Sequence, residues 1–147
     1  MGNVKTYKVT GMDYYKKAIK TLAVKNYDYG YTKKELEDNG LIGERVYQYE
    51  YYPIKIELVP EPTNPHDPNA IKVIADGVHV GYIKRGSCAH LLKVIAENRI
   101  EKIDCEMKGG KYKVLLADED DYEDDTYILE KGDAPISVHL FVTELNR

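Results

Sequence analysis

The stretch that decides the fold reads Leu58-Val59-Pro60-Glu61-Pro62-Thr63-Asn64-Pro65-His66-Asp67-Pro68-Asn69-Ala70-Ile71-Lys72-Val73. Apolar residues at its two ends predict two strands. Four prolines lie between them within nine residues. Proline lacks a backbone N–H, so it neither continues a helix nor sits in a central strand. The stretch therefore predicts a strand, an irregular loop and a second strand.

A hairpin is predicted directly after this loop. Asp76-Gly77 separates Ala70–Ala75 from Val78–Ile83, and Asp-Gly favours a two-residue hairpin turn. Gly109-Gly110 is predicted to be the turn of another hairpin. Further strands are predicted over Val4–Thr10, Arg45–Val59, Ile100–Met107, Tyr112–Ala117, Tyr127–Leu129 and Ile136–Leu145.

Three helical stretches are predicted from capping residues. Asp13 and Ser87 are expected to cap two of them, and Thr32-Lys33-Lys34-Glu35 has the form of a capping box. The pattern as a whole predicts a mostly β (α+β) protein, a small β-barrel with two or three peripheral helices. The 147 residues are expected to form a single domain.

Composition and missing motifs narrow the class of function. The formal charge of −4 is uneven, because residues 1–110 carry 17 Lys+Arg against 15 Asp+Glu and residues 111–147 carry 4 against 10. Phosphate-binding, dinucleotide-binding and common hydrolase motifs are absent, which predicts a protein that is not an enzyme and needs no cofactor. The absence of a membrane-spanning run, and the isolated Cys88 and Cys105, favour a cytoplasmic protein.

Three motifs follow one another in a fixed order. Val9-x-Gly11-Met12-x-Tyr14-Tyr15 comes first, the proline stretch second, and Val80-Gly81-Tyr82-Ile83-Lys84-Arg85 third. This order resembles the HIRAN family, whose pattern runs G-x-x-Y-Y, then E-P-x-N-P-x-D-x-N-A-[IV]-x-V, then V-G-[YH]-[IL]-x-[KR]. The resemblance covers roughly residues 4–108. A segment at about 26–52 is predicted to be an insert, and the acidic C-terminal part lies outside the pattern.

The resemblance implies a barrel related to OB and SH3-like folds, and a function in nucleic-acid binding. One HIRAN domain of a helicase-type DNA-repair protein holds the 3′ end of single-stranded DNA. The expected partners are therefore single-stranded nucleic acid, most simply DNA, and a helicase or other repair protein. The residues that match the family's binding positions are Tyr14, Tyr15, Asn64, His66, Asp67, Tyr82 and Arg85.

The resemblance also implies a role for each residue. Tyr14 and Tyr15 would flank or stack on bases, and stacking contributes roughly 1–3 kcal/mol per base. Tyr82 and Arg85 would contact base or phosphate. The other three, Asn64, His66 and Asp67, would line a pocket for the strand end. The sequence departs from the end-binding member at two positions, with Asp13 for its arginine and His66 for its tyrosine, which weakens the expectation of 3′-end specificity.

Other interpretations of the same residues stay open. Asn64 and Asp67 are also residues that close turns within a loop, and Arg85 is also explained as a solvated charge. Asp67 suits a strand end because a carboxylate accepts a hydrogen bond from a terminal hydroxyl but repels phosphate.

Two other functions also stay open. Asp118–Asp125, with seven carboxylates in eight positions, predicts a solvated acidic loop that could instead dock a basic protein partner. A metal-dependent phosphodiesterase using His66-Asp67 is the second alternative, although the spacing of the other histidines predicts no metal site.

Overall fold

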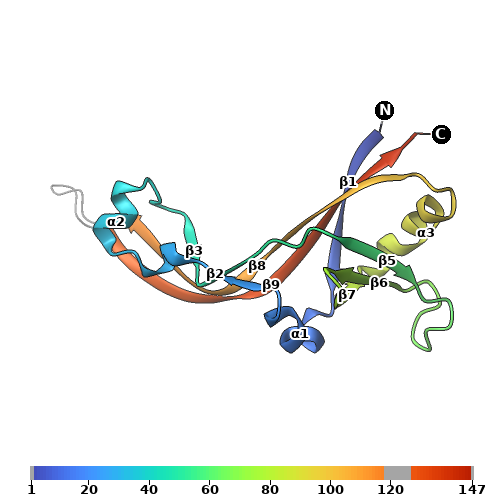
Figure 1. Cartoon of the computed structure of the whole chain (residues 1–147), viewed down its shortest axis with the longest axis horizontal. Helices are drawn as coiled ribbons and strands as arrows, with labels where there is room; N and C mark the ends of the chain where they lie inside the picture. Colours follow the sequence, from blue (N-terminus) through green and yellow to red (C-terminus); the bar gives the residue numbers. More distant parts are fainter. Residues whose placement is uncertain (1, 118–126, 147) are drawn as a thin grey trace. The chain divides into compact units, whose positions relative to one another are not determined.

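The computed structural model describes residues 2–117 and 127–146 (Figure 1). Strands cover 53% of it and helices 23%, which confirms the predicted mostly β class with a few short helices. Most of the strands form a large antiparallel sheet in the order β3-β8-β9-β1-β7-β6-β5, whereas β2 and β4 pair separately, and no closed barrel is found in the described residues. The acidic segment 118–125 lies outside the described residues.

The elements follow one another with short connections. In chain order they are β1 (Gly2–Thr10), the 3₁₀ helix η1 (Met12–Tyr15), α1 (Lys16–Lys20), β2 (Ala23–Lys25), η2 (Tyr27–Gly30), α2 (Lys33–Asp38), β3 (Arg45–Tyr47), β4 (Tyr49–Tyr51), β5 (Ile56–Pro60), β6 (Ile71–Ala75), β7 (Val78–Ile83), η3 (Arg85–Ser87), α3 (Cys88–Ala96), β8 (Ile100–Ala117) and β9 (Tyr127–Leu145).

The chain divides into two compact units. The first unit comprises residues 1–23, 51–107 and 137–147, and the second comprises residues 24–50 and 108–136. The long strands β8 and β9 contribute residues to both. Most of the segment predicted to be an insert lies in the second unit, together with residues 108–136. The expectation of a single domain stays a prediction.

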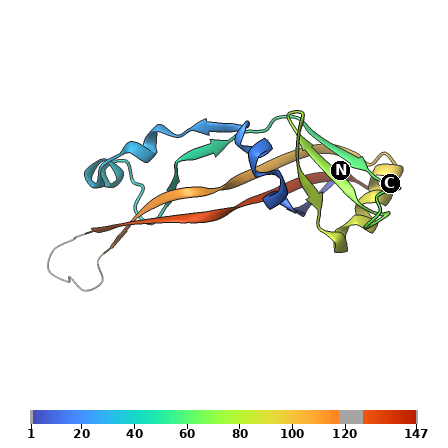
Figure 2. The ribbon, with the colours of Figure 1, turned by 90° about the horizontal axis from the view of Figure 1, so that it is seen from below.

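The first unit is built on β1, which lies between β9 and β7 (Figures 1 and 2). The β1–β9 register sets Tyr7 opposite Leu140 and Val9 opposite Val138, and all four side chains are buried. Because side chains alternate along a strand, this face of β1 and β9 looks into the core and the other face looks away from it.

The predicted hairpin is formed by β6 and β7. Asp76 and Gly77 make the turn with positive φ angles of 47° and 80°, as a primed two-residue turn requires. The β6–β7 register shifts between Val73 and Ile74. The strand β5 pairs with the other side of β6, so the proline stretch joins two neighbouring strands of the sheet.

Two predicted helix caps are wrong. Asp13 lies inside η1 and forms an ion pair with Lys16 at 3.5 Å instead of capping a helix. Ser87 precedes α3, but η3 runs directly into this helix, so Ser87 has helical backbone angles (φ −103°, ψ −6°) and makes no capping bond. An N-cap needs an extended conformation to direct its side chain at the helix N–H groups.

The predicted Gly109-Gly110 hairpin is also wrong, because β8 is one strand from Ile100 to Ala117. Gly109 has a φ of 145°, and a Cβ there would lie 2.5 Å from the carbonyl oxygen of Pro135. The glycine therefore allows close approach to β9 instead of a chain reversal. The two last predicted strands are likewise one strand, β9.

The second unit has its own small core of Leu36, Val46 and Leu115. The predicted capping box is confirmed: Thr32 accepts from the Glu35 N–H, and the Glu35 carboxylate accepts from the Thr32 N–H, at the start of α2. Lys113 is buried beneath this unit's surface, where its ammonium donates to the Tyr31 carbonyl. Burial lowers the pKa of Lys113.

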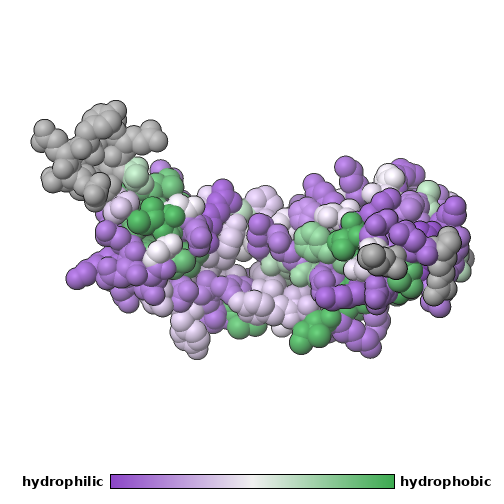
Figure 3. Space-filling model, turned by 90° about the horizontal axis from the view of Figure 1, so that it is seen from above, coloured by the Kyte–Doolittle hydropathy of each residue, from purple (hydrophilic) through white to green (hydrophobic). Residues whose placement is uncertain are grey.

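The surface is predominantly hydrophilic, with hydrophobic side chains in separate patches on the face that Figure 3 shows. Among the described residues, no helix has the length and apolar character needed to cross a membrane.

Candidate functional site

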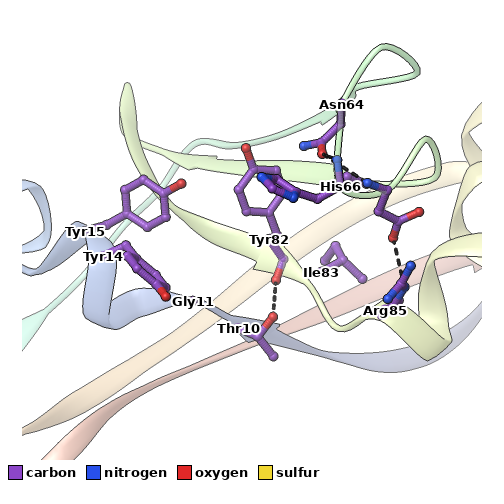
Figure 4. Close-up of a pocket in the computed structure, with 11 residues that line it drawn as sticks. Thr10, Gly11, Tyr14, Tyr15, Asn64, His66, Tyr82, Ile83 and Arg85 are labelled. Atoms are coloured by element: carbon purple, nitrogen blue, oxygen red, sulfur yellow. Dashed lines mark hydrogen bonds and ion pairs between the residues drawn. The ribbon is translucent and has the colours of Figure 1, made fainter.

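A hollow of about 500 Å³ opens on the first unit (Figure 4). All seven residues singled out from the sequence line it, although they come from three separate segments. Figure 4 shows Tyr14 and Tyr15 on one side and Arg85 on the other. The lining consists of Thr10, Gly11, Tyr14, Tyr15, Asn64, His66, Asp67, Ala70, Tyr82, Ile83 and Arg85.

Asn64 holds the proline loop in shape. Its side-chain oxygen accepts from the backbone N–H groups of His66 and Asp67, at 2.9 and 3.1 Å. Its amide nitrogen donates to the Glu61 carboxylate at 3.0 Å. Prolines have no backbone N–H to donate within a turn, and this one side chain joins the start of the loop at Glu61 to its middle at His66 and Asp67. Asn64 therefore acts mainly as a brace.

Asp67 joins the loop to the far side of the hollow. One carboxylate oxygen accepts from the Asn69 N–H at 2.9 Å, and the other lies 3.5 Å from the Arg85 Nε. The Asp67 side chain is 19% exposed and that of Arg85 80%. Arg85 is thus tethered at one end but keeps most of its guanidinium donors in solvent.

Tyr15 and Tyr82 line the hollow, and the ring of His79 packs against both of them from outside the lining. Tyr15 packs on His79 with ring centroids 4.1 Å apart, and His79 meets Tyr82 edge-on at 5.0 Å. The His79 ring also contacts the Gly81 carbonyl at 3.1 Å. Burial and the nearby Lys72 lower the pKa of His79, so this imidazole is neutral at pH 7. His79 therefore acts as an apolar support that fixes the Tyr15 ring.

Glu61 anchors these rings to the loop. The Tyr82 hydroxyl donates to its carboxylate at 2.9 Å, beside the bond from Asn64. Hydrogen bonds from Asn64 and Tyr82 lower the pKa of Glu61. Burial and the bond to Glu61 raise the pKa of Tyr82 to about 12, so its hydroxyl stays a donor at neutral pH.

Tyr14 and His66 are lining residues whose side chains are exposed to solvent. Tyr14 is 89% exposed and follows Gly11, whose φ of 82° turns the chain out of β1. His66 is exposed on the proline loop. Asp13, by contrast, does not line the hollow. The hollow thus offers free aromatic faces, one accessible guanidinium and a largely occupied carboxylate.

Sequence reasoning missed the supporting residues. Glu61 belongs to the proline motif, so its place there could have indicated that it supports the site. No feature of the sequence pointed to His79, because its contact with Tyr15 depends on the register shift in the β6–β7 hairpin.

A family model for the HIRAN domain matches residues 4–110, which contain every residue of the lining. Comparison with curated proteins and with solved structures found no match. Over the parts of the chain that the structure covers, no group of three or more His, Cys, Asp or Glu side chains is placed to hold a metal ion.

Proposed function

Because the chain belongs to the HIRAN family, whose domains are nucleic-acid-binding modules, we propose that its hollow binds the end of a single-stranded DNA. One observation carries the proposal. Residues from three separated segments line a single hollow and leave aromatic and cationic groups open to solvent. A volume of about 500 Å³ falls within the ~300–1,000 Å³ usual for small-ligand sites, which suits a terminal nucleotide.

Base stacking supports a single strand as the ligand. Tyr14 presents an almost fully exposed ring, and Tyr15 is held in place by His79. Every base has an aromatic face, so stacking contributes roughly 1–3 kcal/mol per base with little dependence on sequence. A duplex hides these faces, and a single strand exposes them.

Backbone attraction comes from Arg85. Its guanidinium can bind a phosphate through two parallel hydrogen bonds while its Nε stays near Asp67. His66 adds an exposed ring on the proline loop. Asp13, which replaces an arginine of the end-binding relative, pairs with Lys16 and stays out of the lining, so it adds little repulsion there.

Asp67 is the group that could distinguish a strand end. A 3′ hydroxyl can donate to its carboxylate oxygen facing Arg85, whereas a 3′ phosphate at the same place would be repelled. The other oxygen is occupied by the Asn69 N–H, which keeps the carboxylate oriented.

The proposal extends to the role in the cell. A binding module of this kind would serve DNA repair or processing beside a helicase or another repair protein, in the cytoplasm. We expect no turnover of nucleotides or nucleic acid by the purified chain. Metal-dependent hydrolysis that co-purifies with the protein and disappears in His66→Ala would overturn this part.

Fluorescence anisotropy with 5′-labelled single strands tests the function. The strands carry either a 3′ hydroxyl or a 3′ phosphate, and a duplex of the same sequence is the control. We expect the 3′-hydroxyl strand to bind most tightly and the duplex least.

Asp67→Asn sharpens this test, because the amide keeps an oxygen for the Asn69 N–H but loses the charge. The variant should narrow the difference between the two strand ends. Equal affinity of the wild-type protein for both ends would remove the end-reading role, and no binding of any strand would refute the function.

A further inference from the structure

Lys84, Lys8 and His139 form a row on the first unit. Lys84 directly follows β7, Lys8 lies in β1 and His139 lies in β9. The Lys84 N–H donates to the Lys8 carbonyl at 2.9 Å, which sets these residues opposite each other where β7 ends beside β1. The β1–β9 register sets Lys8 opposite His139. Adjacent strands lie ~4.8 Å apart, so the row spans about 10 Å.

This row lies on the face of the sheet that looks away from the core. Tyr7 and Val9, the neighbours of Lys8 in β1, are buried, whereas Lys8 is exposed. Val138 and Leu140 flank His139 in the same way in β9. The helix α3 packs on the other face.

The helix α3 packs its buried Leu91 and Val94 into the core, and it also makes a polar contact with the core face of the sheet. Its His90 lies 2.8 Å from the buried Glu144 carboxylate, which also accepts from the Tyr7 hydroxyl. Glu144 follows the same alternation as Val138 and Leu140, so α3 covers the buried side and leaves the Lys84–Lys8–His139 row to the opposite side.

The row is continuous with the hollow. The next pair of β1 and β7 on the same face is Thr10 opposite Tyr82, and both of these residues line the hollow. The pair beyond the row is Thr6 opposite Phe141, the one phenylalanine of the chain, which is partly exposed. Moving away from the hollow along this face, a ligand meets cationic groups and then an aromatic ring.

Electrostatics indicate what would lie there. Like charges directly opposite each other in a sheet are destabilising, and Lys8 and Lys84 stand in this relation. Within the described residues, neither ammonium lies within ion-pair distance of a carboxylate. An anionic chain laid over the row would offset this repulsion, and the lysines would release the counterions condensed on its phosphates.

We propose that a single strand whose end sits in the hollow continues over this outward face, with its phosphates on Lys84 and Lys8 and a base on Phe141. This inference rests on the proposed function and extends the contact beyond the strand end. His139 and Phe141 lie in β9, past residue 110 where the family match ends, so they add a contact from outside the matched region.

Oligonucleotide length separates this surface from the hollow. The double variant Lys8→Ala/Lys84→Ala is compared with Lys93→Ala/Lys102→Ala, which removes the same charge from α3 and β8. The ligands are a trinucleotide, which the hollow alone can hold, and a strand of about 12 nucleotides, within the ~4–16 that one small binding fold covers.

We expect the Lys8/Lys84 variant to bind the long strand about tenfold more weakly. The slope of the logarithm of the binding constant against the logarithm of the salt concentration should become shallower by about 1.4, because two phosphate contacts are lost. Its affinity for the trinucleotide should stay within about twofold of wild type, because stacking in the hollow is untouched. The Lys93/Lys102 variant should bind both strands like the wild type. Phe141→Ala should weaken only the long strand, and thermal unfolding verifies that each variant is folded.

Each other outcome has a definite meaning. An unchanged affinity of the Lys8/Lys84 variant for the long strand overturns the inference and leaves the proposed function intact. An equal loss for both strands also overturns it, because the lysines would then act on the hollow. If wild-type protein binds neither strand, the proposed function itself fails.

Discussion

The two sides of the hollow use their polar groups differently. On the proline-loop side, Asn64 and Asp67 direct side-chain oxygens at N–H groups of their own loop. On the open side, Tyr14 and Arg85 are 89% and 80% exposed. Asn64 therefore shapes the site, whereas Tyr14 and Arg85 are free to touch a ligand. Asp67 does both, because one of its carboxylate oxygens holds the loop and the other faces Arg85.

The largest effect on binding is expected from Tyr14→Ala. Removing this ring should weaken single-strand binding by roughly 1–3 kcal/mol, or about 5- to 150-fold, because a base loses its stacking partner. The unfolding temperature should not change, since the ring is almost fully exposed. Anisotropy and calorimetry measure the two quantities, and Tyr14→Phe, which keeps the ring, should bind like the wild type.

Asn64→Ala should affect stability as well as binding. Three hydrogen bonds are lost, each with a net value of about 1 kcal/mol or less, so we expect a loss of about 2 kcal/mol in unfolding free energy. Denaturant titration measures it. The matched control is Thr63→Ala, an exposed neighbour with no side-chain hydrogen bond among the described residues. A stable Asn64→Ala protein that only binds weakly would place Asn64 among the contact residues instead.

Arg85→Ala should reduce the binding free energy by about 1 kcal/mol, which is a roughly fivefold loss of affinity. The slope of affinity against salt concentration on logarithmic axes should fall by the amount that one phosphate contact contributes. Its stability should change little, because the pair with Asp67 is mostly exposed on the arginine side. Anisotropy over a range of salt concentrations gives both numbers. A salt dependence identical to the wild type would show that Arg85 meets no phosphate.

Glu61→Gln is expected to give the smallest effect, and one that depends on pH. The folded-state pKa of Glu61 lies below its usual 4.5, because Asn64 and Tyr82 donate to the carboxylate. Its stabilisation is therefore present above pH 4.5 and is lost as the pH falls through the folded-state pKa. The difference in unfolding temperature between wild type and variant should be constant near neutral pH and shrink in acid. A difference that grows in acid would contradict this assignment.

Local sequence signals predicted the parts of the fold that depend on few residues. Asp76-Gly77 and the capping box at Thr32 need only their neighbours, and both form as predicted. Gly109 was misassigned because its role depends on the close approach of Pro135, a residue of another strand. Ser87 failed as a cap because the preceding 3₁₀ turn fixes its backbone.

The same distinction holds for the site. The three motifs singled out Tyr14, Asn64 and Arg85 as binding residues, although they come from segments far apart in the chain. All three line the hollow. The motifs did not distinguish residues that support the loop from residues that are free to contact a ligand, because this difference depends on hydrogen-bond geometry. They also gave no sign of His79, whose packing follows from a register shift.

The most direct test of the central claim is a map of the binding surface by amide chemical shifts. ¹⁵N-labelled protein is titrated with a short single-stranded DNA ending in a 3′ hydroxyl. We expect the largest shifts at Gly11, Tyr14, Tyr15 and Arg85, with smaller ones at Asn64 and Asp67. Shifts confined to the second unit, or a titration in which none of the hollow residues moves, would contradict it.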